Sequence, residues 1–245
     1  MDFHGKVALI TGASVGIGRA VALEMARCGA KLILFDIDFE KLQSVKEELA
    51  VYTEDVAIYR CDVSDEACVN AAVQDGFSKF GKIDILVNNA ALWRVHARFL
   101  QTPIDTWKKY FDVNVMGTVY VTHAVLPHMI EQNYGRVINV ASVAGVYGNK
   151  GMACYSATKG AVISFTKALA KEVAESGITV NATSPGTVSP SDNGDVDFHK
   201  PSPLSHMGRT GTDRENADLI CFLASDKAGY ISGQNIQIDG CRKNI

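Results

Sequence analysis

Short apolar segments recur along the chain and alternate with amphipathic stretches. Five of them are rich in β-branched residues and apolar at nearly every position, at residues 6–11, 31–36, 56–61, 83–88 and 136–141. Two more lie at residues 178–182 and 235–238. Strands that are apolar on both faces are typical of a parallel sheet covered by helices on both sides. The pattern therefore predicts a seven-stranded parallel sheet.

Helical patterns fill the intervals between these segments, for example at residues 18–28, 38–50 and 65–80. The alternation of strands and helices predicts an α/β fold with a doubly wound, Rossmann-type sheet and helices on both faces. No linker, repeat or low-complexity tract interrupts the alternation. We therefore expect residues 1–245 to form a single domain.

Residues 187–208 break the alternation. This segment contains three prolines, two glycines and few periodic apolar residues. Long polar loops in compact domains are usually functional or mobile. We expect this segment to form a short lid over a ligand-binding site.

Composition and charge exclude several classes of protein. Apolar residues make up 47% of the chain, and no apolar run approaches the roughly 20 residues of a membrane span. The net charge of −3 offers no basic surface for nucleic acid. The first residues lack the features of a secretory leader, the six cysteines form no Cys-x-x-Cys pair, and the histidines show no metal-ligand spacing. The sequence predicts a cytoplasmic protein with reduced thiols, no metal, and no nucleic-acid or membrane partner.

A glycine-rich turn follows the first predicted strand. Residues 11–18 read TGASVGIG, with glycines at positions 12, 16 and 18, and a helical pattern begins there. Glycines let the backbone approach a pyrophosphate, and the N-terminus of the helix supplies N–H groups and positive potential. An NTPase loop would continue with Lys-Ser or Lys-Thr, whereas this chain continues with Arg-Ala. The turn therefore predicts a dinucleotide site.

The second predicted strand ends at Asp36. A carboxylate at this position accepts hydrogen bonds from the adenosine ribose and repels a 2′-phosphate. Neither residues 13–15 nor residues 37–40 contain a Lys or Arg that would attract that phosphate. Asp36 could instead cap the next helix, but Asp38 is better placed to do so. The pattern favours NAD over NADP.

Tyr155 and Lys159 stand four residues apart in a segment that favours helix, so their side chains share one face. Ser142 follows the fifth predicted strand, at the carboxyl edge where open α/β sheets bind ligands. A tyrosine that transfers a proton must overcome a reference pKa of about 10. A nearby ammonium and the nicotinamide cation would favour the phenolate.

In this order, the motifs resemble those of the short-chain dehydrogenase/reductase family, over essentially the whole chain. The shared motifs are the glycine-rich turn, Asp62-Val63, the Asn-Asn-Ala-Ala run at 88–91, Asn114, Ser142, Tyr155-x-x-x-Lys159 and Pro185-Gly186. The resemblance implies a dinucleotide-binding catalytic domain that interconverts a secondary alcohol and a ketone by hydride transfer with NAD(H). It also points to a homotetramer, consistent with apolar residues on more than one face of the helical segments 106–129 and 153–174.

The resemblance also implies roles for four catalytic residues. Tyr155 would be the general acid/base, and Ser142 would hydrogen-bond the substrate oxygen. Lys159 would bind ribose hydroxyls and tune Tyr155, while Asn114 would hold a water in the proton relay. Three of the motif residues also have a purely structural explanation: Ser142 could cap a strand, Asn114 could satisfy buried backbone groups, and Asp62 could begin a turn.

Further residues are expected to contact the cofactor. By the resemblance, Asp62 and Val63 would contact adenine, and Asn89 would lie beside the adenosine ribose. The full expected set is Gly12, Ser14, Gly16, Ile17, Gly18, Asp36, Asp62, Val63, Asn89, Tyr155, Lys159, Pro185, Gly186 and Val188.

Two positions depart from the family pattern. Ala91 stands where the family usually has Gly, and Pro190 stands where it often has Thr. A glycine is needed at position 91 only if the backbone there has positive φ. With Pro190 in place, contacts to the nicotinamide carboxamide could fall to the Val188 backbone, Thr187 or Ser189.

Trp93, Arg94 and Tyr147 are candidate substrate residues, because they follow the fourth and fifth predicted strands. A basic group there would favour a small polar or anionic hydroxy compound, although Trp93 and Tyr147 could equally line an apolar pocket. Two alternatives to the dehydrogenase remain. One is a regulatory protein that senses NAD(H) without turnover, and the other is an epimerase or dehydratase on the same scaffold.

Overall fold

The computed structural model describes residues 1–189, 191 and 194–243. In this part of the chain a seven-stranded parallel sheet has the order β3-β2-β1-β4-β5-β6-β7. The predicted Rossmann-type sheet is therefore confirmed. Its strands are β1 (Val7–Thr11), β2 (Lys31–Asp36), β3 (Val56–Arg60), β4 (Ile85–Asn88), β5 (Gly135–Val140), β6 (Ile178–Pro185) and β7 (Asn235–Ile238).

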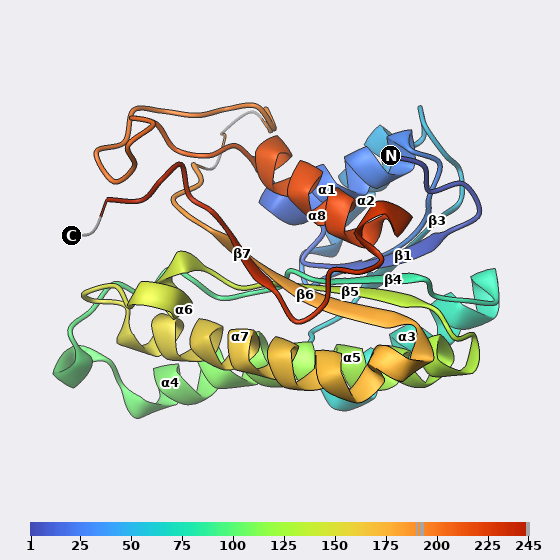
Figure 1. The fold of residues 1–245 in the computed structure, drawn as a ribbon, viewed down its shortest axis with the longest axis horizontal. Coiled ribbons are helices and arrows are strands. Elements are labelled where there is room, and N and C mark those ends of the chain that lie inside the picture. Colours follow the sequence, from blue (N-terminus) through green and yellow to red (C-terminus); the bar gives the residue numbers. More distant parts are fainter. Residues whose placement is uncertain (190, 192–193, 244–245) are drawn as a thin grey trace.

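Helices cover both faces of the sheet (Figure 1). One layer consists of α1 (Gly16–Arg27), α2 (Phe39–Leu49) and α8 (Asp213–Ala224). The opposite layer consists of α3 (Glu66–Phe80), α4 (Ile104–Phe111), α5 (Gly117–Glu131), α6 (Val143–Tyr147) and α7 (Ala153–Val173). A π-helical turn, Asp112–Met116, joins α4 to α5, and short 3₁₀ turns lie at Phe99–Gln101, Ala174–Ser176 and Asp226–Ala228.

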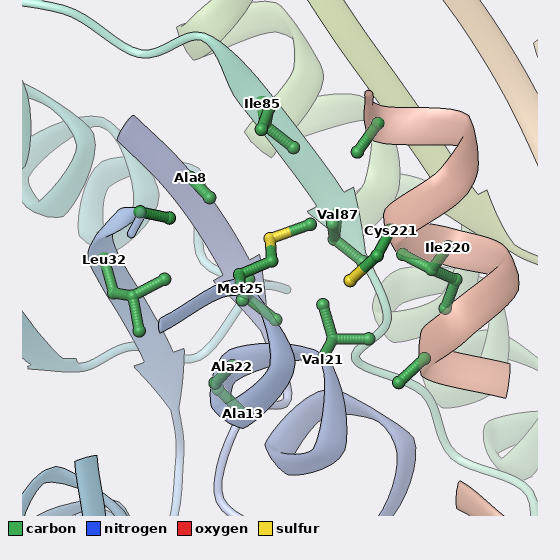
Figure 2. Close-up of a cluster of buried hydrophobic side chains, with 14 of the residues drawn as sticks. Ala8, Ala13, Val21, Ala22, Met25, Leu32, Ile85, Val87, Ile220 and Cys221 are labelled. Atoms are coloured by element: carbon green, nitrogen blue, oxygen red, sulfur yellow. The ribbon is translucent and has the colours of Figure 1, made fainter. Parts of the chain in front are cut away.

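Alternate residues of each central strand supply two separate cores. In β1, Ala8 and Ile10 pack with α1 and α8, while Val7 and Leu9 pack with the helices of the other layer. Figure 2 shows the first core, where Met25 of α1 lies between the sheet and α8. Burial on both faces explains why the strands are apolar at nearly every position.

The order in which strands are added to the sheet reverses at β1. Strands β2 and β3 extend the sheet on one side of β1, and β4 then pairs with its other side. Ligands of open α/β sheets bind at the carboxyl ends of strands beside such a switch point. A dinucleotide is therefore expected to bind between the loops that follow β1 and β4.

The loop after β6 returns to the sheet through contacts with distant segments. Val188 pairs with Gly211, and Ser205 pairs with Arg242 near the C-terminal end of the described chain. Arg242 also donates a hydrogen bond to Asn149 Oδ1 (2.9 Å), beside α6. Pro190, which stands in this loop, lies outside the described residues.

No helix among the described residues is both long and apolar enough to cross a membrane. In the same residues, no group of three or more His, Cys, Asp or Glu side chains could hold a metal ion.

Candidate active site and cofactor cleft

A cleft of about 1230 Å³ opens along the carboxyl ends of four neighbouring strands. Its walls come from Gly12 after β1, Asp36 at the end of β2, Asp62 after β3 and Asn89 after β4. The first residue of α8, Asp213, closes one side. The sheet topology thus gathers residues that are far apart in sequence into one elongated site.

The glycines of the turn between β1 and α1 are required by packing and by backbone conformation. A Cβ on Gly12 would stand 2.8 Å from Ala90 Cα, and one on Gly18 would stand 2.1 Å from the Gly12 carbonyl oxygen. Gly16 has a φ of +59°, which residues with side chains rarely adopt. Larger residues at these positions would push the turn away from β4 or strain it.

The N-terminus of α1 borders the cleft with spare hydrogen-bond donors. Val15, the N-cap residue, makes no side-chain capping bond, and the first turn contains no acidic residue. The first N–H groups of a helix have no partner inside it and carry positive potential. Ser14 and Ile17 also line the cleft beside this end. The site suits a diphosphate.

Asp36 keeps its carboxylate at the cleft wall. Its Oδ2 accepts a hydrogen bond from the Ser14 N–H (2.9 Å), and its Oδ1 accepts one from the Asp38 N–H (2.9 Å). Asp38 caps α2 by accepting a hydrogen bond from the Lys41 N–H (3.2 Å), as the sequence predicts. Each Asp36 oxygen retains acceptor capacity, which is what two ribose hydroxyls require.

Asp62 and Val63 line the cleft after β3. Asp62 Oδ1 accepts hydrogen bonds from the Ser64 N–H (3.0 Å) and hydroxyl (2.7 Å), which fixes the turn. Val63 packs so closely on α5 that a Cβ on Gly117 would stand 2.7 Å from Val63 Cγ2. Both residues therefore lie in rigid backbone, with room for a flat ring beside them only on the cleft side.

Asn89 ties the glycine-rich turn to the end of β4. Its Nδ2 donates hydrogen bonds to the carbonyl oxygens of Thr11 (3.0 Å) and Gly12 (2.9 Å). In return, Thr11 Oγ1 accepts hydrogen bonds from the N–H groups of Asn89 (3.0 Å) and Ala90 (3.1 Å). Asn89 lines the cleft as expected, and its amide also holds the turn in place.

Tyr155 and Lys159 lie on α7, four residues apart, with Lys159 Nζ 5.9 Å from the centroid of the Tyr155 ring. Ser142 caps α6, where its Oγ accepts a hydrogen bond from the Ala144 N–H (3.1 Å). The Ser142 side chain also interacts with the Tyr155 phenol. The fold thus brings these three predicted residues together where β5 ends.

Close contact between α6 and α7 keeps Ser142 near Tyr155. A Cβ on Gly145 of α6 would stand 2.6 Å from the Lys159 carbonyl carbon and 2.7 Å from Gly160 N. The clash would be with backbone, which cannot move away cheaply. Gly145 is therefore a packing residue of this cluster that the sequence motifs do not mark.

Lys159 is buried and has no carboxylate partner among the described residues. Its side chain is 3% exposed, and Nζ donates a hydrogen bond to the Val140 carbonyl oxygen (2.6 Å). Burial lowers the pKa of Lys159 to about 8. An ammonium has three donors, so two remain for hydroxyl groups of a bound molecule.

The pKa of Tyr155 is raised in the protein alone. Burial of the phenol is the main cause, and the interaction with Ser142 opposes it. Tyr110 of α4 adds a further rise. The Lys159 ammonium is not among the causes of this shift, so the lowering of the Tyr155 pKa expected from a neighbouring ammonium is not seen in the protein alone.

Asn114 lies in the π-helical turn and is fully buried. Its Oδ1 accepts a hydrogen bond from the Leu92 N–H (2.7 Å), and its Nδ2 donates to the Leu92 carbonyl (2.9 Å) and to Thr158 Oγ1 (3.0 Å). Leu92 belongs to the cleft wall, whereas Thr158 precedes Lys159 on α7. Asn114 therefore joins the dinucleotide cleft to the Tyr155 cluster, which itself lies outside the cleft lining.

The end of β6 completes this region. Gly186 N–H donates to the Ile238 carbonyl (2.9 Å), and a Cβ on Gly186 would stand 2.8 Å from Asp239 Cα. Pro185 is the last residue of β6, and Val188 lines the cleft. Ser189 is 3% exposed and its hydroxyl has no hydrogen-bond partner in the described residues.

Ala91 does not require a glycine conformation. Among the described residues other than glycine, positive φ occurs at Asn133 and Cys241, and not at Ala91. The departure from the family pattern at this position therefore leaves the backbone geometry intact. Ala91 lies in the cleft wall.

The three candidate substrate residues do not form one pocket. Trp93 and Arg94 line the cleft, with the guanidinium carbon 5.5 Å from the Trp93 ring centroid. Arg94 is close enough to Lys41 of α2 for the two charges to repel, so it lies on the side of Asp36. Tyr147 ends α6, is 53% exposed and is not part of the cleft lining.

Several residues of the site have no motif that announces them. Thr11, Thr158 and Gly145 hold the turn, Asn114 and Ser142 in place. Tyr110 is 4% exposed, and its hydroxyl accepts a hydrogen bond from the Val95 N–H (2.8 Å) beside the Tyr155 cluster. Thr11 belongs to the glycine-rich turn quoted above. The roles of the other residues follow only from their contacts in the folded structure.

The residues present fit a nicotinamide dinucleotide. The open side of Gly16 and the uncapped helix end suit the diphosphate, and the Asp36 carboxylate suits a ribose. The spare donors of the buried Lys159 ammonium suit the hydroxyls of a second ribose.

Comparison with known proteins supports the same assignment. Residues 6–200 match the family model described as short chain dehydrogenase. The chain is 41% identical to a 3-oxoacyl-(acyl-carrier-protein) reductase, FabG, of Thermotoga maritima over 243 residues, covering 98% of each chain. It is 35% identical to a 2-dehydro-3-deoxy-L-rhamnonate dehydrogenase (NAD(+)) of a Sphingomonas species, covering 98% of this chain and 96% of that protein.

A solved structure is similar over nearly the whole chain. The crystal structure of an NAD+-bound xylitol dehydrogenase superposes with a TM-score of 0.91 at 34% identity, covering 98% of this chain and 100% of the other. The order of motifs, the sheet and these comparisons agree. The chain belongs to the short chain dehydrogenase family and is an oxidoreductase that uses a nicotinamide cofactor.

Proposed function

We propose that the protein is an NAD(H)-dependent dehydrogenase that interconverts a secondary alcohol and a ketone, with Tyr155 as general acid/base. The observation that carries this proposal is the cluster of Ser142, Tyr155 and Lys159 beside a cleft with an acidic residue at its ribose end. A protein that only sensed the cofactor would have no use for a buried phenol and ammonium held together.

The chain's own residues manage the proton of the reaction. The Ser142 Oγ accepts a hydrogen bond from the Ala144 N–H, and its hydroxyl also interacts with the Tyr155 phenol. A substrate oxygen bound between the two hydroxyls would accept the Ser142 O–H hydrogen. Tyr155 takes the hydroxyl proton during oxidation and returns it during reduction. When bound, the nicotinamide ring supplies the hydride acceptor or donor and, in its oxidised form, a positive charge.

Lys159 and Asn114 support this proton transfer. Two donors of the Lys159 ammonium bind ribose hydroxyls, and its charge favours the phenolate of Tyr155 once a ligand excludes water. The Asn114 amide is engaged on three hydrogen bonds, which makes it a positioning residue. A water that Asn114 holds in a relay would donate to the remaining lone pair of Oδ1 or to the backbone carbonyl oxygen, which also accepts a hydrogen bond from Thr118 Oγ1 (3.1 Å).

The cofactor assignment to NAD rests on Asp36. Its carboxylate accepts ribose hydroxyls and repels a 2′-phosphate, and Val15 in the glycine-rich turn supplies no compensating cation. The NAD+ in the names of the rhamnonate dehydrogenase and the xylitol dehydrogenase supports the same choice.

Replacing Asp36 should change this preference. We expect Asp36→Ala combined with Ile37→Arg to raise kcat/KM for NADP+ relative to NAD+ by about tenfold or more, because the repulsion is removed and a phosphate partner added. Steady-state kinetics with both cofactors measure the ratio. The single variant Ile37→Arg separates the new cation from the lost carboxylate. A wild-type protein that already prefers NADP+ would refute the assignment.

We propose a small polar or anionic hydroxy compound as substrate. The polyol and sugar-acid names of two relatives support this class. We also propose residues 187–208 as a lid, because this segment connects Val188 in the cleft to the C-terminal segment at Arg242.

The deciding experiment is a screen that follows the absorbance of reduced nicotinamide. Polyols, sugar acids and simple secondary alcohols are offered with NAD+ or NADP+, and 3-oxoacyl thioesters with NADH or NADPH. Turnover of a polyol or sugar acid with NAD+ is the expected result. Preference for 3-oxoacyl thioesters with NADPH would overturn both the substrate and the cofactor assignments. Chemical conversion without net change in absorbance would indicate an epimerase.

We propose a cytoplasmic homotetramer. The cysteines are free thiols, which suits a reducing compartment. α4 and the turn before it expose large apolar side chains, among them Leu100 (93%) and Ile104 (67%). Exposed apolar groups of this kind mark protein interfaces.

Sedimentation at micromolar concentration tests the assembly. We expect a mass about four times the 26.4 kDa of one chain. Substituting Ile104→Glu should shift that mass toward smaller species if α4 lies in an interface. A monomeric wild-type protein would refute the proposal.

A further inference from the structure

A buried carboxyl group without a hydrogen bond lies in the wall of the cofactor cleft. Asp213 is the first residue of α8 and is 8% exposed. Its neighbours Thr212 and Glu215 satisfy one another in a capping box, whereas the Asp213 carboxyl group makes no hydrogen bond to any described residue. This is an expensive arrangement for an ionised side chain.

Asp213 faces the place where the diphosphate is expected. Its Oδ1 would lie 3.8 Å from a Cβ on Gly16, and no other described atom outside the turn and the first turn of α1 stands within 4 Å of that point. Gly16 is the first residue of α1, and both residues line the same cleft. A phosphate bound at the α1 N-terminus would therefore come close to the Asp213 carboxyl.

The charges around Asp213 do not neutralise it. Arg19 of α1 is the cation that acts on it within the described residues. The Arg19 guanidinium is already engaged by both oxygens of Glu48 on α2 (2.6 and 2.8 Å) and by the Gly194 carbonyl (2.7 Å). On α8 itself the charged neighbours are paired with residues away from the cleft, Arg214 with Asp197 and Glu215 with Arg209.

We propose that Asp213 binds a phosphate oxygen of the cofactor as the neutral carboxylic acid, so that dinucleotide binding takes up a proton on this side chain. An ionised carboxylate would repel the diphosphate dianion, whereas the protonated form donates an O–H hydrogen bond to it. The proton comes from solvent, and no covalent bond changes. The inference rests on the dinucleotide site of the proposed function.

The ionisation of Asp213 in the free protein agrees with this role. Burial raises its pKa to about 6, and Arg19 opposes part of the rise. A bound dianion raises the pKa further, because it disfavours the carboxylate. Between the two pKa values, affinity for the cofactor should fall by about tenfold for each pH unit, since one proton is bound only in the complex.

Calorimetry of cofactor binding tests the inference directly. NADH, ADP-ribose and adenosine are titrated into the wild-type protein from pH 5.5 to 8.5, in buffers of different ionisation enthalpy. NADH and ADP-ribose should take up close to one proton near pH 7 and weaken as pH rises. Adenosine has no phosphate and should show neither effect.

Two variants separate the carboxyl from its surroundings. Asp213→Asn should bind ADP-ribose up to about a hundredfold more tightly than wild type at pH 8 and show no proton uptake. Asp218→Asn removes the same charge from the exposed side of α8, outside the cleft lining, and should behave like wild type. Binding of ADP-ribose to wild type without proton uptake would overturn the inference and leave the cofactor site standing. Failure of ADP-ribose to bind at any pH would overturn both.

Discussion

Replacing Tyr155 with phenylalanine is expected to lower kcat by about a thousandfold and to leave the affinity for NADH nearly unchanged. The phenol supplies the transferable proton, whereas ribose binding is assigned to Lys159 and Asp36. Steady-state turnover and NADH fluorescence titration measure the two effects separately.

Tyr110→Phe is the matched control for Tyr155→Phe. It removes the same hydroxyl from a buried tyrosine near the cluster, one whose oxygen accepts a backbone hydrogen bond from Val95. This variant should keep turnover within about tenfold of wild type. A Tyr155→Phe enzyme that retains a tenth or more of the wild-type kcat would show that another group carries the proton.

Replacing Lys159 with methionine is expected to abolish turnover and yet to stabilise the cofactor-free protein at neutral pH. The buried ammonium has a pKa of about 8 in the folded protein, below its ordinary value of 10.5. Between these pH values the unfolded chain binds a proton that the folded protein does not, so stability rises with pH. Below pH 8 both states are charged, and the cost of burial is present in full, about 3 kcal/mol.

Urea unfolding of the cofactor-free protein at pH 7 and near pH 10 checks this sign. Lys159→Met should raise the free energy of unfolding at pH 7 by up to about 3 kcal/mol, less the lost hydrogen bond to Val140. The gain should shrink toward pH 10. Lys167→Met, at an exposed position of α7, should change stability little at either pH. A Lys159→Met protein that is destabilised equally at both pH values would contradict the burial argument.

The sheet was predictable because its strands are buried on both faces. β1 sends Ala8 to one core and Leu9 to the other, so hydrophobicity alone marks it. The end of β6 was not predictable in this way. Thr183, Ser184 and Pro185 are polar or lack an N–H. They are strand because they pair with β7, and Thr183 also pairs with β5. The predicted strand stopped at residue 182 for that reason.

The candidate site divides along the same physical line. Tyr155 and Lys159 are four residues apart, so a helix places them on one face. The glycines of the turn allow a backbone conformation that other residues rarely adopt. Both features depend on local sequence and could therefore be predicted. Asp213 could not be found in this way. Its role depends on Gly16, which is close in space and nearly two hundred residues away in sequence. The position of Arg94 could not be predicted either, because its proximity to Lys41 depends on the path of the loop after β4.

The π-helical turn at Asp112–Met116 makes this region sensitive to changes in chain length. Deleting one residue there would restore regular α-helical hydrogen bonding, and every side chain on one side would rotate by about 100° relative to the other. Both helices bury side chains, namely Tyr110 on α4 and Val121 and Val125 on α5. After such a rotation, the buried side chains of α4 or those of α5 would turn toward solvent. Asn114, between them, would lose its registration with Leu92. In this segment we therefore expect point substitutions to be tolerated better than single-residue deletions. A surface loop, in contrast, tolerates both kinds of change.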